Sequence, residues 1–231
     1  PNKEVLTLVQ TIDNKPYLEY DGEYYRVYDF IENSVCLQIP RDTNEFYQSA
    51  VAFGDFTCML GDFDATQLYE VLPNFHNTVN RFKNFEASLE ANLSGRAHLA
   101  TEEINFALAR KGIVSKIVSL IENGKMPLKV THNDTKLNNV LLNAETLEGL
   151  AVIDLDTVMP GSVCYDFGDS IRFGCNSSYE DEEDLSKVYF KMDMFEAYVK
   201  GYLSTMKNIT EVEKECLVDG AILMTFECGI R

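Results

Sequence analysis

The sequence lacks any run of the roughly 18 uninterrupted apolar residues that a membrane-spanning helix requires. It also lacks an amino-terminal pattern of basic residues followed by an apolar stretch, which would mark the chain for export. Basic residues are scarce, because 20 Lys and Arg stand against 37 Asp and Glu and the formal net charge is −17. Such a charge repels polyanions and excludes binding to the phosphate backbone of nucleic acids. We therefore expect a cytoplasmic protein with neither nucleic-acid nor membrane partners.

The six cysteines lack the CxxC spacing that is typical of zinc sites and redox motifs. They stand in apolar surroundings, which favours free buried thiols in a reducing cytoplasm over disulfides or zinc ligands. The rest of the composition is ordinary for a globular protein. With 45% hydrophobic and 25% charged residues, the chain can form one large domain or a small lobe and a larger one.

The hydrophobic pattern predicts a β-rich beginning. Residues 6–33 alternate apolar and polar side chains and are rich in Val, Ile, Thr and Tyr. Asp21-Gly22 is typical of a tight turn, so we expect a β-meander in this segment. The remainder is expected to be mainly helical, which makes the fold class α+β.

Helices and short strands are predicted over the remaining chain from periodicity and capping residues. Asp184 is the expected N-cap of a helix that begins at Leu185, and Thr210 with Glu213 fits a capping box for the last helix. The acidic run 179–185 is expected to be a solvated loop that leads into the first of these helices. The other predicted elements are helices at about 43–61, 78–93 and 102–123, with a break at Gly112, and strands at 127–131, 139–143 and 149–154.

A polar cluster lies at the ends of the predicted strands. The segment "HNDTKLNN" places Asp134 on a loop, five positions before Asn139, and Asp154 ends the strand "AVID". Phosphoryl transfer requires a carboxylate that accepts or orients the attacking hydroxyl, and oxygen ligands that hold Mg²⁺ against the nucleotide phosphates. The spacing matches the kinase catalytic-loop pattern H-x-D-x-x-x-x-N. We therefore predict that Asp134 is the base or orienting group, that Asn139 and Asp154 hold Mg²⁺, and that Lys136 reaches the transferring phosphate.

Neighbouring polar residues have simpler interpretations. His132 is expected to pack beneath the loop as a hydrogen-bonded residue, and Asn138 to form the turn. Asp156 is either a second metal contact or a hairpin cap. Asp166-Phe167-Gly168 resembles the magnesium motif of protein kinases but stands too far along the chain. We therefore interpret Asp166 as a structural brace that caps a helix.

A phosphatase of the haloacid-dehalogenase type is a competing hypothesis for "AVIDLDTV". In that class Asp154 would be the nucleophile and Asp156 the acid. Such a fold needs a parallel sheet and further lysine and acidic motifs after this strand, whereas residues 155–231 have a helical pattern. The sequence therefore favours a kinase.

Four blocks in order, "LPNFHNT", "THNDTKLNNVLL", "VIDLDTVMPG" and "DFGDSIRFG", carry a family resemblance. The sequence resembles the aminoglycoside phosphotransferase and choline kinase-like family of the protein-kinase-like fold, and within it the N-acetylhexosamine 1-kinases. The resemblance implies a two-lobe architecture, with residues 1–33 a remnant of the amino-terminal β lobe and hinge. Residues 34–231 would be the helical carboxyl-terminal lobe with the catalytic hairpin.

The resemblance further implies ATP- and Mg²⁺-dependent phosphorylation of a sugar hydroxyl, namely the anomeric hydroxyl of an N-acetylhexosamine. The backbone of Phe30, Ile31 and Glu32 would contact adenine, and Phe173 would pack on the sugar. In the family, the phosphate-covering loop and the strand lysine would precede residue 1, and the sequence would continue beyond residue 231. The chain is therefore expected to be truncated at both ends and to bind ATP poorly alone.

Several alternatives stay open. An aminoglycoside or choline-type phosphotransferase would keep the fold with another acceptor, and a catalytically silent kinase-like module would keep only binding. A protein kinase is disfavoured, because the segment between Asp154 and the next helix is short. His76, Asn77 and Arg81 in "FHNTVNR" are interpreted as structural residues, with the asparagine as a helix cap.

Overall fold

The computed structural model describes residues 5–179 and 182–231, so residues 1–4 of the predicted β lobe and residues 180 and 181 of the acidic run lie outside it. The strands are β1 (Leu8–Val9), β2 (Leu18–Tyr20), β3 (Glu23–Tyr25), β4 (Val27–Tyr28), β5 (Ser34–Cys36), β6 (Lys129–Thr131), β7 (Val140–Asn143), β8 (Gly149–Val152) and β9 (Met159–Gly161). The α-helices are α1 (Thr43–Met59), α2 (Thr78–Ala91), α3 (Thr101–Leu108), α4 (Lys116–Glu122), α5 (Val163–Gly174), α6 (Met192–Thr205) and α7 (Glu211–Ile230).

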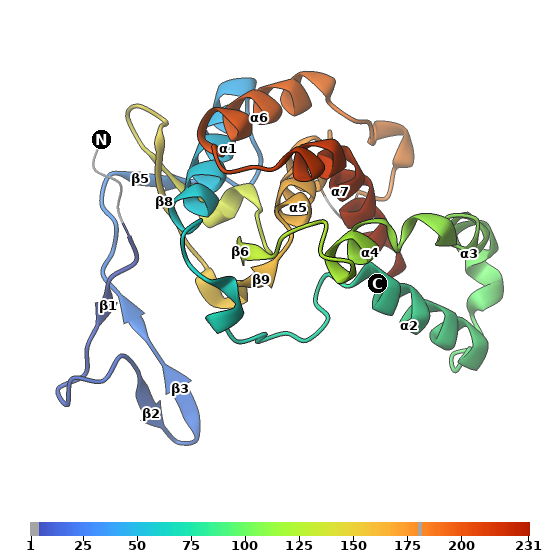
Figure 1. Ribbon diagram of the computed structural model, residues 1–231, viewed down its shortest axis with the longest axis horizontal. Helices are drawn as coiled ribbons and strands as arrows, with labels where there is room; N and C mark the ends of the chain where they lie inside the picture. Colours follow the sequence, from blue (N-terminus) through green and yellow to red (C-terminus); the bar gives the residue numbers. More distant parts are fainter. Residues whose placement is uncertain (1–4, 180–181) are drawn as a thin grey trace.

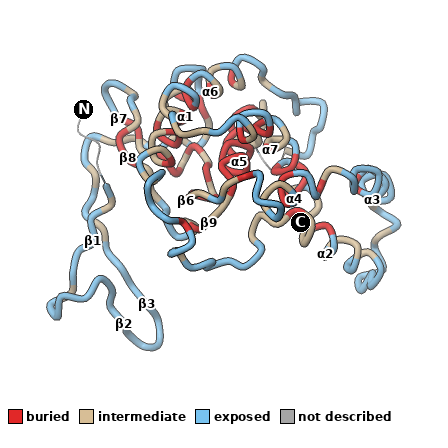
Figure 2. The backbone as a smooth tube through the Cα atoms, in the orientation of Figure 1, coloured by how far each residue is buried: buried red, intermediate tan, exposed pale blue. Residues whose placement is uncertain are grey.

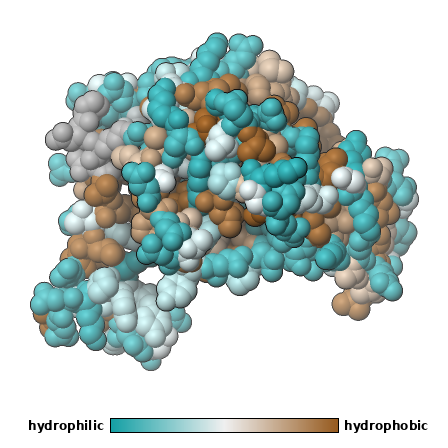
Figure 3. Space-filling model, viewed as in Figure 1, coloured by the Kyte–Doolittle hydropathy of each residue, from teal (hydrophilic) through white to brown (hydrophobic). Residues whose placement is uncertain are grey.

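The amino-terminal strands form an arm that extends away from the helical body (Figure 1). Strand β1 pairs with β4 and β2 with β3, both antiparallel. The β2–β3 turn has positive φ at Asp21 (52°) and Gly22 (79°), as a two-residue hairpin turn requires. The tight hairpin is therefore present, but the predicted meander is wrong, because β1 pairs with β4 around the β2–β3 hairpin and not with the next strand. Most of the arm is exposed (Figure 2), and hydrophobic residues lie on its surface (Figure 3), among them Leu8, Val9 and Ile12.

Strand β5 belongs to the body. It pairs with β7, and β7 pairs with β8, which gives a three-stranded antiparallel sheet in the order β5-β7-β8. Strands β6 and β9 form a separate antiparallel pair. The segment between β4 and β5 thus connects the arm to the hairpin that carries the predicted site. The division of the chain at residue 33 stays a prediction.

The helix predictions from periodicity are correct for α1 and α2. The predicted helix 102–123 is divided into α3 and α4 by a 3-10 turn at Lys111–Ile113, close to the expected break at Gly112. The capping box of Thr210 and Glu213 is present at the start of α7. Local signals were sufficient in these places because the caps and breaks act within one helical turn.

The prediction of a helix that begins at Leu185 is wrong. Asp184 caps only the 3-10 turn Leu185–Lys187, and α6 begins at Met192. The intervening chain is extended because it pairs with residues at the end of α5. The Ser177 N–H donates to the Tyr189 carbonyl at 3.1 Å, and the Lys191 N–H donates to the Cys175 carbonyl at 2.8 Å.

Helix α5 lies at the centre of the body and is buried along most of its length (Figures 1 and 2). It crosses α7 at a close approach of two glycines, Gly168 and Gly220, where an added Cβ on either residue would overlap the backbone of the other helix. Helix α6 packs on α1 beside them, with Phe46 and Tyr198 in ring contact at 4.6 Å. The core therefore holds α5 rigidly, which matters because α5 supports the site.

All six cysteines are free thiols. Cys164, Cys175 and Cys216 are buried, as expected, but Cys36 on β5 is exposed. Burial raises the pKa of the Cys164 and Cys175 thiols to about 12, so these groups stay protonated and inert. No helix within residues 5–179 and 182–231 is long and apolar enough to cross a membrane.

Candidate active site

Asp134, Lys136 and Asn139 are brought together on the loop between β6 and β7. The Asn139 Nδ2 donates to the Asp134 backbone carbonyl at 2.7 Å and to its carboxylate Oδ2 at 3.0 Å. The Lys136 Nζ lies 3.1 Å from Asp134 Oδ1. Both carboxylate oxygens are therefore oriented, and the Asp134 side chain stays 28% exposed and accessible to a ligand.

Asp154 lies at the same end of the β7–β8 hairpin. The residue before it, Ile153, donates its N–H to the Asn139 carbonyl at 2.9 Å and accepts from His132 Nε2 at 2.8 Å. Asp154 itself is exposed and has a left-handed backbone, with φ 59° and ψ 57°. A non-glycine residue in this region is held there by its surroundings. The fold thus places Asp154 directly after a residue that is bonded to Asn139.

The donor chemistry of Asn139 and Asp154 fits Mg²⁺. The amide N–H₂ of Asn139 is directed at Asp134, which leaves its Oδ1 as a neutral oxygen ligand, and Asp154 offers an exposed carboxylate. Magnesium favours one or two protein oxygen ligands and retains water and phosphate oxygens for the rest. When bound, the ion would neutralise charge that develops on a transferring phosphate.

His132 packs beneath the loop, as predicted. It is fully buried and contacts the rings of Phe53 and Phe56 at centroid distances of 5.5 and 5.9 Å. Its Nε2 faces the Ile153 carbonyl, and its Nδ1 accepts the Asp134 N–H at 3.3 Å. These partners assign the neutral ring with the proton on Nε2. His132 therefore orients the loop and has no free nitrogen for proton transfer.

Asp166 is the brace that the sequence predicted, but it caps no helix end. Ser162 is the N-cap of α5. Asp166 lies in the first turns of that helix, and its Oδ2 and Oδ1 accept the N–H groups of His132 at 2.8 Å and Asn133 at 2.7 Å. Burial raises the pKa of Asp166, and the two backbone N–H groups oppose burial by stabilising the carboxylate.

Asp156 is not a hairpin cap. It lies inside the 3-10 turn Leu155–Thr157 and forms an ion pair with Arg26 of the arm. The hydrogen bond with Asp156 raises the pKa of Arg26. Both side chains are about half exposed, at 45% and 55%, so the pair contributes little to stability. It connects the arm to the segment that follows Asp154.

The residues predicted to contact the nucleotide and the sugar lie on two other segments. Phe30 is 84% exposed, and with Ile31 and Glu32 it lies between β4 and β5. Phe173 is half-buried on α5, three residues after Ser170, whose hydroxyl donates to the Thr135 carbonyl at 2.7 Å. Residues three apart share a helix face, so Phe173 lies on the side of α5 that supports the catalytic loop. Their ligand contacts stay predictions.

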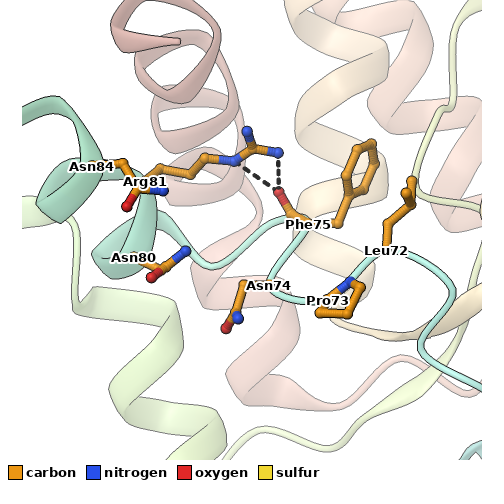
Figure 4. A pocket seen from close by; sticks show the side chains of 7 residues that line it. All are labelled: Leu72, Pro73, Asn74, Phe75, Asn80, Arg81 and Asn84. Atoms are coloured by element: carbon orange, nitrogen blue, oxygen red, sulfur yellow. Dashed lines mark hydrogen bonds between the residues drawn. The ribbon is translucent and has the colours of Figure 1, made fainter. Parts of the chain in front are cut away.

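The segment "FHNT" holds a residue whose position the sequence did not reveal. Asn77 caps α2 by accepting the Asn80 N–H at 2.9 Å, as expected. Arg81 donates to the Phe75 carbonyl at 3.1 and 2.7 Å and lines an open pocket of about 370 Å³ (Figure 4). His76, however, contacts the Asn133 carbonyl at 3.0 Å, next to Asp134. The two residues are 57 positions apart, and no local pattern connects them.

Comparison with known families identifies the class of this protein. The model of the phosphotransferase enzyme family matches residues 7–203. The chain belongs to this family. The matched range includes the predicted site residues Asp134, Lys136, Asn139 and Asp154, and also His76. Family membership confirms the expected enzyme class, a phosphotransferase that acts on hydroxyl acceptors.

Solved structures agree on the fold. A microcompartment-associated aminopropanol kinase is 15% identical with a TM-score of 0.51, and the match covers 99% of the phosphotransferase chain and 67% of that kinase. The ethanolamine kinase of Plasmodium vivax is 14% identical with a TM-score of 0.55, covering 93% of the phosphotransferase chain and 59% of that kinase. At these identities the likeness shows the fold alone. The α+β, protein-kinase-like fold class is confirmed.

Proposed function

We propose that the whole protein is an ATP- and Mg²⁺-dependent kinase that phosphorylates a hydroxyl group of a small molecule. The acceptor is a sugar, and the anomeric hydroxyl of an N-acetylhexosamine is the first candidate. The observation that carries the proposal is the position of the Asp134 carboxylate. Asn139 contacts its Oδ2 and Lys136 its Oδ1, and the side chain stays partly exposed. Such a carboxylate can accept or orient the attacking hydroxyl.

The neighbouring side chains would bind the phosphates, the metal ion and the nucleotide. Lys136, beside Asp134, supplies a positive charge that can stabilise a transferring phosphate. Asn139 and Asp154 would hold Mg²⁺ against the nucleotide phosphates. The backbone of residues 30–32 would contact adenine from the connection between the arm and the hairpin.

An amino-bearing acceptor is the second candidate. The net charge of −17 favours a cationic ligand over a neutral or anionic one. The similar kinases are named for aminopropanol and ethanolamine, both of which carry an amine. An aminoglycoside or a choline-type alcohol would use the same Asp134 and the same metal ligands. A silent binding module is disfavoured, because such a module has no physical need for a base together with two magnesium ligands.

The test is ATP consumption by the full-length protein with Mg²⁺. The acceptors are N-acetylglucosamine, N-acetylgalactosamine, glucose, galactose, kanamycin and choline. We expect turnover of an N-acetylhexosamine, and we expect Asp134→Asn to lower kcat by about 10²–10⁴-fold, the usual contribution of a general base. Asp62→Asn, an exposed carboxylate after α1, is the matched control.

The outcomes separate the hypotheses. Turnover of kanamycin or choline alone would keep the reaction and replace the sugar with a cationic acceptor. Nucleotide binding without turnover of any acceptor would favour the silent module. Full activity of Asp134→Asn with any acceptor would contradict the assigned role of this carboxylate.

A further inference from the structure

The peptide group between Asn133 and Asp134 contacts a histidine ring on each of its two polar edges. Its N–H, which belongs to Asp134, donates to His132 Nδ1 at 3.3 Å. Its carbonyl, which belongs to Asn133, accepts from His76 Nε2 at 3.0 Å. A peptide group is planar, so two contacts on opposite edges fix its rotation. That rotation sets the direction in which the Asp134 side chain leaves the backbone.

Asn133 needs such restraint because its backbone is left-handed, with φ 65°. Asparagine tolerates this conformation better than other non-glycine residues, but it is still less favourable than the right-handed region and is stabilised by contacts with its surroundings. The Asn133 N–H donates to Asp166 Oδ1 at 2.7 Å, and its Nδ2 donates to the Thr157 carbonyl at 2.9 Å. Gly161 adds close support, since a Cβ there would lie 2.9 Å from Asn133 Oδ1. His76 completes the set by holding the carbonyl.

His76 also connects the loop to the carboxyl-terminal helix. Its Nδ1 lies 3.1 Å from Glu227 Oε1 on α7, and the two side chains are only 10% and 3% exposed. Both partners of the ring, a carbonyl and a carboxylate, are acceptors. A neutral imidazole has one N–H and can donate to only one of them. The two contacts together therefore require the His76–Glu227 pair to retain a shared proton.

The surroundings favour that protonated pair. Burial by itself lowers the pKa of His76, but the hydrogen bond and charge of Glu227, with the Asn133 carbonyl, outweigh burial and raise it. Glu227 Oε2 is buried without a hydrogen-bond partner among the described residues, so His76 is its carboxylate's main support. The titratable and charged groups that face the ring are Arg81 of α2, Tyr165, Asp166 and Asp169 of α5, and Glu227 of α7.

We propose that His76 is a positioning residue for phosphoryl transfer, which together with Glu227 holds the Asn133–Asp134 peptide in the orientation that Asp134 needs. The proposal rests on the proposed function, because it assigns a role in the same site. Loss of the shared proton releases one of the two contacts. Activity then falls on the alkaline side while binding of the acceptor changes little, because neither residue contacts the hydroxyl.

The test uses the full-length protein and three variants. His76→Gln removes the ring, Glu227→Gln keeps the ring but removes the charge that holds the proton, and His98→Gln changes an exposed histidine as the matched control. Hydrogen exchange of the amides of residues 132–139 and the NMR titration of the histidines need no acceptor. The sequence has 3 histidines, so comparison with His76→Gln and His98→Gln assigns their signals. ATP consumption against pH gives kcat and KM separately.

In the wild type we expect His76 to titrate above the unperturbed value of about 6.5 and kcat to fall with the same alkaline midpoint. In Glu227→Gln both midpoints move to lower pH. In His76→Gln the loop amides exchange faster and kcat falls roughly ten-fold or more at unchanged KM, as expected for loss of a buried charged hydrogen bond. His98→Gln changes none of these quantities.

Unchanged loop exchange together with an unmoved histidine midpoint in Glu227→Gln would overturn the proposal. A loss of folding in His76→Gln would leave the decision to Glu227→Gln, which is nearly isosteric. If no acceptor is phosphorylated, the exchange and titration data still decide the role of His76, and the failure belongs to the proposed function.

Discussion

Replacing Asp166 by Asn keeps the size of the side chain and removes one of the two acceptors that brace the catalytic loop. The carboxylate accepts the N–H of His132 at 2.8 Å and that of Asn133 at 2.7 Å. An amide offers one oxygen and one N–H₂ group, so one of these buried N–H groups must face another donor. Losing a bond to a charged acceptor and leaving the donor unpaired costs about 2–3 kcal/mol.

The variant also weakens the restraint on the left-handed backbone of Asn133, where strain is worth roughly 1–3 kcal/mol. Relief of part of this strain when the loop relaxes offsets some of the loss, so the net cost does not exceed that of the lost hydrogen bond. We expect the free energy of unfolding to fall by about 3 kcal/mol. For a chain of this size the melting temperature then falls by roughly 6–12 °C.

The measurement is urea unfolding of the full-length protein, with hydrogen exchange of the His132 and Asn133 amides. Asp62→Asn, at an exposed carboxylate, is the control and should lie within about 0.5 kcal/mol of the wild type. An Asp166→Asn variant as stable as this control, with both amides still protected, would show that the brace contributes nothing. Loss of protection at only one of the two amides would identify which N–H faces the new N–H₂.

Three further predictions concern other buried or charged groups. Lys129→Met leaves the buried Glu213 without its ion pair at 2.8 Å and should lower the free energy of unfolding by about 3–5 kcal/mol. Lys116→Met removes a more exposed ion pair, with Asp219, and should lower it by less than about 1 kcal/mol. Urea unfolding measures both variants. The pKa of His76 is raised by folding, so its contribution to stability is complete below about pH 6.5 and is lost as the pH rises through the folded pKa. The free energies of unfolding of His76→Gln and of the wild type, measured across this range, should therefore converge at alkaline pH. A difference that stays constant with pH would contradict the raised pKa of His76. Asp154→Asn should raise the Mg²⁺ concentration for half-maximal turnover at least about ten-fold, and an unchanged Mg²⁺ dependence would remove Asp154 from the metal site.

Features formed by residues only a few positions apart could be predicted from the sequence. The catalytic-loop pattern is one example, because Asp134 and Asn139 are five residues apart and meet through a single turn. The capping box of Thr210 and Glu213 is another, since both of its hydrogen bonds close within one helical turn. The helix predicted from Asp184 failed because a good N-cap does not specify how long the structure after it continues.

Contacts between distant segments were beyond such patterns. Arg26 and Asp156 are 130 positions apart, and their pairing depends on how the arm meets the hairpin. The role of Asp166 was inferred correctly as a brace, but its partners on the loop follow from the crossing of α5 beneath β6, not from its place in α5. In each case the side chain can form hydrogen bonds with several kinds of partner, and the tertiary packing determines which partner lies within reach.

The sequence alone predicted an acidic α+β kinase-like chain, the loop that carries Asp134, and the residues that we propose as Mg²⁺ ligands. These features are encoded by charge, by hydrophobic period and by short spacings, all of which act locally along the chain. The tertiary structure alone placed His76 on the peptide next to Asp134, Glu227 on the His76 ring, and Arg26 on Asp156. Such contacts join segments 57 to 151 positions apart. The contacts of His76 form when α7 and the start of α2 close on the loop and bury these polar groups, whereas the exposed Arg26–Asp156 pair forms where the arm meets the segment after Asp154.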